Sequence, residues 1–416
     1  MRLSKYSFGI GDRFARQGRA QLDAILEARK EGVLITPVWN KSFREHHIIG
    51  SSPKETREEA DRAVKEAEWD QAYFVDADHI GMSNVDHFLD FSDYFTIDVA
   101  DHIGSPVQDE DVERFVRENE ELTGTLHIEG FSQPSVIKPD EIRESAAKFL
   151  AAVAEVEKVY RYILKHKKRY KIAIEISMDE VEQPQSPSEL LLILKMLADR
   201  DVHPNTIAVK FCGQFNKGVD YRGDIDRFAR EFEQHLLVID FATRKFRLPE
   251  NLKLSIHSGS DKFSLYRPIH NILKRHNRGI HVKTAGTTWL EELIGLLSAG
   301  EEGVEIVKKI FGNALQRREE LTARYRSVTD IDPAMLPERK EIEKWSGKKL
   351  VNMLRHNPDH PEYNPQVRQL LHCAYKIAAE MGEQFTDALE KHEPVIAPCV
   401  KENLYERHIR PLFLGG

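Results

Sequence analysis

Short apolar, β-branched runs alternate with longer segments of helical periodicity between residues 7 and 286. The runs lie at 7–10, 33–38, 72–75, 94–99, 125–129, 172–176, 206–211, 253–257 and 280–283. Strands that alternate with helices build a parallel sheet, because each helix returns the chain to the start of the next strand. Eight or so units fit a closed TIM-like (β/α)8 barrel, which typically takes about 250 residues. We therefore predict an α/β barrel, with one strand candidate more than the barrel needs.

The character of the chain changes after Gly286. Residues 288–325 and 339–382 have helical patterns, a Pro-containing junction at 329–337 separates them, and no strand pattern follows residue 284. We expect a TIM-like barrel catalytic domain at residues 1–325. A helical C-terminal extension at residues 326–416 should then pack on the barrel or cap its mouth.

Charge and cysteine content exclude several classes of protein. The 416 residues carry 60 Lys and Arg against 68 Asp and Glu, a net charge of −8, so the chain shows no basic footprint for nucleic acid. Its apolar runs are too short for a membrane span, which needs about 20 residues, and we expect a cytoplasmic protein. Three cysteines without a CxxC pair indicate neither disulfides nor a thiolate zinc site. The expected partner is a small molecule, and a homo-oligomer is compatible with the sequence.

Polar side chains stand near the carboxyl ends of several strand candidates, where barrel enzymes carry their reactive groups. Alternation places His127 with Glu129, and His281 with Lys283, on shared strand faces. Charged groups inside apolar strands are costly unless they are paired or bound to a metal. A metal-dependent active site is the simplest explanation of this pattern.

Histidines at three strand ends are the candidate metal ligands: His79, His257 and His281. Taken singly, each could equally be a structural or surface histidine. Together with carboxylates they match the ligand sets of zinc, nickel or manganese. Glu129 is the candidate for a fourth ligand or a substrate contact, and His127 is a reserve imidazole.

Acid–base chemistry needs two groups on opposite sides of the reacting carbon, and Asp78 and Glu175 are the candidates. Alternatively, Asp78 caps a helix and Glu175 pairs with Lys210 or Lys283. Either lysine could instead form a Schiff base. Ser258 opens the segment 258–262, which could hold substrate hydroxyls or a carboxylate. The charged segment 44–47 could contact an anionic substrate or form a solvated loop.

Five segments together resemble the tagaturonate/fructuronate epimerase family, whose members are also used as tagatose 4-epimerases. They lie at 6–14 (YSFGIGDRF), 76–79 (DADH), 126–130 (LHIEG), 255–262 (SIHSGSDK) and 281–286 (HVKTAG). The resemblance implies a metal-dependent barrel enzyme of bacterial hexuronate catabolism that interconverts D-tagaturonate and D-fructuronate by inversion at C4. It implies that Asp78 is the proton acceptor, with His79, His257 and His281 as metal ligands.

Inversion at C4 restricts the mechanism, because C4 of a 2-keto hexuronate is not adjacent to the carbonyl carbon. Removing the C4 hydroxyl proton instead allows C3–C4 cleavage to an enediolate and an aldehyde, which rotates and recombines. Transient oxidation at C4 would require a nicotinamide, and no GxGxxG fingerprint is present. We therefore expect a retro-aldol route with Asp78 as base, Glu175 as acid and a metal holding the C2 carbonyl and C3 hydroxyl.

Two other functions fit the same residues. A metal-dependent ketose 3-epimerase or sugar isomerase could use Glu129 and Glu175 as its carboxylate pair. A non-catalytic protein that binds sugar acids could use the same barrel. For the uronate expected from the resemblance, a bound cation and lysines such as Lys210, Lys262 and Lys283 would reverse the sign of the charge at the barrel mouth of this acidic chain.

Overall fold

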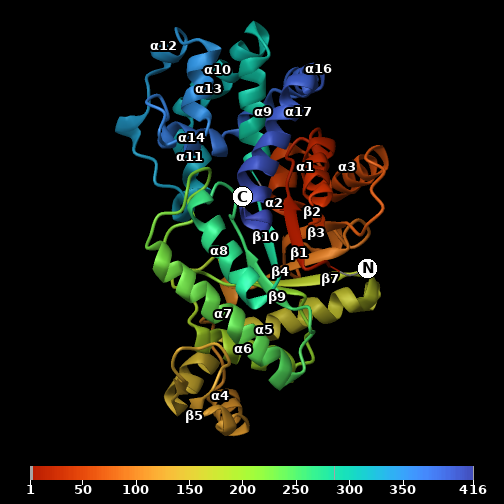
Figure 1. The fold of residues 1–416 in the computed structure, drawn as a ribbon, viewed down its shortest axis with the longest axis vertical. Coiled ribbons are helices and arrows are strands. Elements are labelled where there is room, and N and C mark those ends of the chain that lie inside the picture. Colours follow the sequence, from red (N-terminus) through yellow and green to blue (C-terminus); the bar gives the residue numbers. More distant parts are fainter. Residues whose placement is uncertain (1–2, 285, 416) are drawn as a thin grey trace.

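The barrel is closed by eight parallel strands in the order β1-β10-β9-β8-β7-β4-β3-β2. The computed structural model describes residues 3–284 and 286–415, so Ala285 of the 281–286 segment lies outside it. The strands are β1 (Tyr6–Ile10), β2 (Ile35–Ser42), β3 (Phe74–Ile80), β4 (Tyr94–Asp98), β7 (Ala173–Ser177), β8 (Thr206–Ala208), β9 (Lys253–Ile256) and β10 (Ile280–Lys283). The predicted TIM-like barrel is confirmed (Figure 1).

The run at 125–129 is the extra strand candidate, and the expectation that it forms a barrel strand is wrong. Its residues fall in β5 (Gly124–Leu126), which pairs antiparallel with β6 (Ser135–Ile137) in a separate hairpin. The hairpin and α4 (Asp109–Glu118) form an insertion at the lower end of the molecule in Figure 1. Thr125 is exposed, and so are His127 and Glu129 beyond the strand. A barrel strand would be covered on both faces, so this pattern fits only an outlying ribbon.

Helices surround the barrel as the sequence pattern predicts. They are α1 (Gly18–Lys30), α3 (Pro53–Glu66), α5 (Pro139–His166), α6 (Pro187–Asp199), α7 (Ile225–Phe246), α8 (Phe263–His276) and α9 (Thr287–Ser298). Ser186 caps α6, since its hydroxyl accepts the backbone N–H of Glu189, and Pro187 occupies the first helical turn. The segment 81–93, which contains only the short helix η1 (Val85–His87), connects β3 to β4 in place of a long helix.

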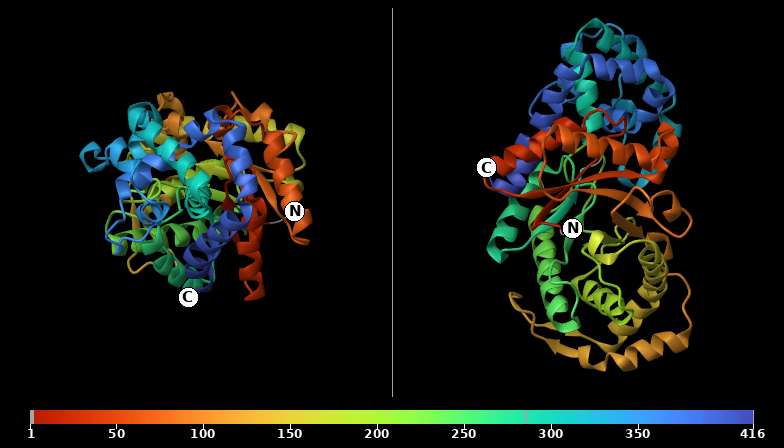
Figure 2. Two further views of the ribbon diagram at one scale, coloured as in Figure 1. Left: turned by 90° about the horizontal axis from the view of Figure 1, so that it is seen from above. Right: turned by 90° about the vertical axis from the view of Figure 1, so that its right-hand side faces the viewer.

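The rest of the chain is helical and packs above the barrel (Figures 1 and 2). It contains α10 (Glu301–Gln316), α11 (Arg318–Thr322), η5 (Ala323–Val328), α12 (Arg339–Ile342), α13 (Gly347–Leu354), α14 (Pro365–Cys373), α15 (Tyr375–Glu380), α16 (Glu383–Lys391), α17 (Glu393–Glu402) and η7 (Asn403–Leu414). Helix α9 is its centre, since α10, α13 and α17 all pack on it. The domain boundary between residues 325 and 326 stays a prediction. None of the helices described is long and apolar enough to cross a bilayer.

The end of the chain returns to the barrel and packs along α1 and α8. The ring of Phe413 of η7 packs at an angle against Tyr6 and edge-on against Phe8 of β1, with ring centroids 5.0 and 5.9 Å away. Aromatic pairs at this spacing stabilise packing beyond their buried area. The first strand and the last helix of the molecule are therefore held together.

Candidate active site

A cavity of about 700 Å³ opens at the carboxyl ends of the barrel strands. Asp78 from β3, Lys283 from β10 and His257 just after β9 line it. Tyr325 of η5 and His372 of α14 also line it, so the C-terminal helices form one wall and cover part of the mouth. Its size and position are those of a small-molecule site in a TIM barrel, where pockets of roughly 300–1,000 Å³ are usual.

Lys283 is the centre of a buried ion cluster at the floor of the cavity. Its Nζ lies 2.8 Å from Asp76 Oδ2, 2.7 Å from Asp78 Oδ1 and 3.0 Å from Glu175 Oε1. Burial lowers the pKa of Lys283, but the carboxylates outweigh burial and hold the pKa well above its usual value. Because three carboxylates surround this ammonium group, it stays charged, which does not suit a Schiff-base nucleophile.

Asp78 faces the cavity as an ionised carboxylate. Burial would raise its pKa, but Lys283 and the neighbouring imidazoles hold the pKa below its usual value. An ionised carboxylate at the cavity floor can accept a proton from a substrate hydroxyl. This position is the one expected from the sequence.

Glu175 lies beneath the cavity rather than in its lining. Its Oε2 accepts hydrogen bonds from Tyr94 at 2.9 Å and Thr206 at 2.7 Å, and its Oε1 lies 2.8 Å from His257 Nε2. Burial would raise the pKa of Glu175, but Lys283 and His257 hold it well below the usual range. A fully buried, ionised and fully engaged carboxylate is not placed to donate a proton to substrate, and it instead fixes the groups around it.

His79 is the last residue but one of β3 and has a left-handed backbone, φ 53°, where the register with β4 also shifts. Its Nδ1 lies 2.7 Å from Asp98 Oδ2, and its Nε2 lies 3.8 Å from Asp78 Oδ1. Burial would lower the pKa of His79, but Asp78 and Asp98 raise it to about 10. Positive φ at a non-glycine residue costs about 1–3 kcal/mol, and such strain often occurs at functional sites.

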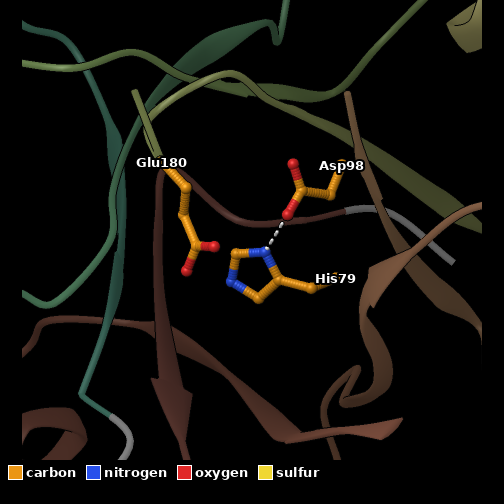
Figure 3. A group of neighbouring side chains, drawn as sticks. All are labelled: His79, Asp98 and Glu180. Atoms are coloured by element: carbon orange, nitrogen blue, oxygen red, sulfur yellow. Dashed lines mark hydrogen bonds and ion pairs between the residues drawn. The ribbon is translucent and has the colours of Figure 1, made fainter. Parts of the chain in front are cut away.

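A candidate metal-binding group surrounds this imidazole. His79, Asp98 and Glu180 each offer a ligand atom, and these atoms lie within 4.8 Å of one another. In Figure 3 the Asp98 carboxylate meets Nδ1 while the Glu180 carboxylate faces the ring from the other side. A carboxylate on one imidazole nitrogen that leaves the other open is the usual support of a metal-ligating histidine.

The other two predicted ligands lie at different depths. His257 lines the cavity, its ring centroid lies 5.3 Å from that of His79, and its Nδ1 is 2.9 Å from Asp179 Oδ1. His281 is fully buried inside the barrel, where Nδ1 meets Ser7 Oγ at 3.0 Å. Burial lowers the pKa of His281 to about 3, so this imidazole is neutral. The structure therefore brings His79 and His257 together and leaves His281 one layer below.

Some of the residues predicted to contact substrate line the cavity and others do not. Lys210 and Ser258 line the cavity, as Lys283 does. His127 and Glu129 do not, because they lie between β5 and β6 of the outlying hairpin, where Glu129 Oε2 lies 3.5 Å from Arg244 Nη2. The polar groups of the site that the sequence interpretation did not single out include Asp98, Asp179, Glu180 and Lys217. Asp98 is the last residue but one of the strand candidate 94–99 and could have been found by that signal, whereas the other three lie in loops without periodicity.

A parallel barrel that gathers an ionised aspartate, two imidazoles and several carboxylates around one polar cavity defines a TIM-barrel enzyme for a small polar substrate. The model of the tagaturonate epimerase family, UxaE, matches residues 1–412. The chain therefore belongs to the tagaturonate epimerase family, and it is an isomerase that acts on carbohydrates.

Individual relatives agree with this family. The chain is 27% identical to the tagaturonate/fructuronate epimerase of Thermotoga maritima, over 97% of this chain and 80% of that protein. Two crystal structures of fructuronate-tagaturonate epimerase UxaE from Cohnella laeviribosi share its fold at 23% identity. The two-glycerol complex gives a TM-score of 0.81 over 99% of this chain and 82% of that chain. The native structure gives 0.77 over 98% and 81%.

Proposed function

We propose that the protein interconverts D-tagaturonate and D-fructuronate by inverting the configuration at C4. Both sugars are named for the relative from Thermotoga maritima, and the family match covers nearly the whole chain. The observation that carries the proposal is the Asp78–Lys283 pair at 2.7 Å on the floor of the cavity. It supplies an ionised carboxylate where a hydroxyl proton could be removed.

The proposed route is retro-aldol cleavage. Asp78 takes the proton of the C4 hydroxyl, the C3–C4 bond breaks, and its electron pair passes to the C2–C3 fragment as an enediolate. The aldehyde at C4 rotates, C3 attacks its other face, and the new C4 oxyanion takes a proton. Atoms and electrons balance without an external oxidant. Because Glu175 lies under the cavity, we assign it a positioning role, and a cavity-lining group other than Asp78 returns the proton.

The donor set around His79 fits a divalent cation. His79, Asp98 and Glu180 are the residues that could hold it. Both ring nitrogens of His257 already lie against carboxylates, at 2.8 Å from Glu175 and 2.9 Å from Asp179. Nitrogen and oxygen donors of this kind accept zinc, nickel and manganese alike. Such an ion would polarise the C2 carbonyl and so stabilise charge that develops on cleavage. We propose on this basis that activity depends on a divalent cation.

The test of the reaction is conversion of D-tagaturonate followed by NMR, with the metal-replete enzyme. We expect D-fructuronate to form, Asp78→Asn to lower kcat by about a thousandfold, which is within the range for lost acid–base groups, and chelation to abolish turnover reversibly. Asp86→Asn is the matched control, because Asp86 contacts Tyr162 on the outer surface. A product altered at C3 or at C1–C2 would contradict the proposal.

Isotope labels separate the mechanisms. The retro-aldol route predicts that a C4 deuteron is retained during turnover, since no bond to that hydrogen breaks. It also predicts that labelled three-carbon aldehyde, added in excess, enters the sugar pool at a low rate. Loss of the C4 deuteron to solvent, without aldehyde exchange, would show direct proton transfer at C4 instead.

A further inference from the structure

The cations that line the cavity divide into engaged and unengaged side chains. Lys283 is held by three carboxylates, and Arg13 Nε lies 3.2 Å from Glu45 Oε1. Lys262, which the sequence suggests for substrate binding, does not line the cavity; it is buried and donates to the carbonyls of Asn216, Val219 and Ser260. These three cations already have their counterparts within the protein.

Four further cations line the cavity: Arg44, Lys210, Lys217 and Arg324. Of these, Arg44 and Lys217 lie within electrostatic range of each other. No carboxylate oxygen of residues 3–284 or 286–415 lies within ion-pair distance of either side chain. Lys217 is fixed nonetheless: its Nζ donates to Ser258 Oγ at 2.7 Å and its backbone N–H to Val328 O at 2.8 Å. Ser258 has a left-handed backbone, φ 52°, directly after His257. A half-buried ammonium group is thus positioned at the mouth beside the catalytic groups.

The two cations also repel each other. Burial lowers the pKa of Lys217, and the charge of Arg44 contributes in the same direction. Three acidic groups lie within electrostatic range of Lys217. Glu45 pairs with Arg13, Asp179 pairs with His257, and Glu180 belongs to the candidate metal-binding group with His79 and Asp98. Two half-buried cations with donors free to the cavity are costly unless an anion joins them.

We propose that Arg44 and Lys217 form the subsite that binds the C6 carboxylate of the hexuronate. This inference rests on the proposed function and extends it to substrate choice. A carboxylate between the two side chains neutralises both and accepts charge-assisted hydrogen bonds from each. Neutral fructose and tagatose, which carry a hydroxymethyl group at C6, leave the cations unpaired. The subsite therefore makes the enzyme prefer uronates over neutral ketoses.

The test compares a uronate with a neutral ketose in Lys217→Met and Arg44→Met, and adds Lys217→Arg. We expect KM for D-tagaturonate to rise at least tenfold in each Met variant. The ratio of kcat/KM for D-tagaturonate over D-tagatose should fall by a similar factor. Lys217→Arg keeps the charge and should recover most of the preference. Lys54→Met, on an exposed helix position, is the matched control.

Binding gives a readout that does not depend on turnover. D-Galactonate has the carboxylate but no ketone, and calorimetry should show weaker binding to Lys217→Met and Arg44→Met than to the wild-type protein. Unchanged galactonate affinity, with unchanged KM for D-tagaturonate in folded variants, would overturn the subsite. Failure of the proposed function can be told apart from failure of the subsite. In that case the wild-type enzyme would leave D-tagaturonate unconverted, while the galactonate binding measurements would still test the subsite.

Discussion

Lys283 compensates more buried negative charge than any other single side chain discussed above. Removing one partner from a buried ionic group typically costs about 3–5 kcal/mol, because the remaining charges lose their counterion. We therefore expect Lys283→Met to lower the free energy of unfolding by about that amount and to abolish activity. Urea denaturation followed by circular dichroism measures the loss.

A second substitution distinguishes charge from packing. Asp76 shares Lys283 with Asp78, and burial is the main reason that the pKa of Asp76 is raised to about 7. Adding Asp76→Asn to Lys283→Met removes one uncompensated carboxylate and should recover part of the lost stability. If the double variant is no more stable than Lys283→Met, the charge argument is wrong.

Glu292 provides a pH-dependent test away from the active site. It is fully buried in α9, neither carboxylate oxygen has a hydrogen-bond partner, and burial with Asp12 and Glu59 nearby raises its pKa well above the usual value. The folded protein therefore holds a proton that the unfolded chain releases, so stability falls as pH rises above the unfolded pKa of about 4.3. Glu292→Gln should remove this penalty.

The measurement is Tm between pH 5 and pH 8. We expect the Tm of Glu292→Gln to fall less over this range than the Tm of the wild-type protein. Glu305→Gln is the control, since Glu305 is exposed on α10. Parallel Tm curves for the wild-type protein and Glu292→Gln would contradict the assigned protonation.

The barrel strands could be predicted from the sequence because buried parallel strands form continuous apolar runs of a characteristic length. The run at 125–129 instead alternates exposed polar and more buried apolar residues, a pattern that indicates a strand but not the sheet that it joins, which explains the error there. Strand alternation likewise placed His281 and Lys283 on one face correctly. Alternation could not show that only Lys283 reaches the cavity. A step of two residues along a strand covers about 6.6 Å, so His281 lies that much deeper in the barrel than Lys283.

The loops that complete the site could not be predicted in the same way. Glu180 and Lys217 follow barrel strands in irregular segments, and their positions depend on long-range contacts such as Lys217 with Val328. Loop residues have no periodicity, so their side-chain directions are set only after the barrel and the C-terminal helices pack.

Substitutions in the outlying hairpin should leave catalysis nearly unchanged. His127 and Glu129 are exposed and far from the cavity lining, so His127→Ala with Glu129→Ala should leave kcat/KM for D-tagaturonate within twofold. The Glu129–Arg244 contact is an exposed ion pair, and such pairs contribute about 0–1 kcal/mol. Steady-state kinetics of the double variant gives the answer, and a tenfold loss would place the hairpin in the active site of an assembled or closed form.

The C-terminal helices and the barrel are joined by a buried ion pair behind the cavity. Arg368 of α14 is fully buried, and its Nη2 donates to Asp261 Oδ1 at 3.1 Å. The same guanidinium donates to the carbonyls of Gly218 and Leu354. His408 of η7 accepts the Asp261 backbone N–H at 3.0 Å. One short loop after β9 thus holds two parts of the C-terminal region.

This arrangement predicts that Arg368 affects both stability and the cavity wall. In Arg368→Met the Asp261 carboxylate loses its main counterion, so the free energy of unfolding should fall by about 3–5 kcal/mol. Because His372 lies one helical turn from Arg368 and lines the cavity, KM for D-tagaturonate should rise more than kcat falls. Arg410→Met, which breaks only an exposed pair with Glu406, should change neither quantity. Adding Asp261→Asn to Arg368→Met should restore part of the stability. If Arg368→Met instead has wild-type stability and wild-type KM, the C-terminal helices are held by apolar packing alone.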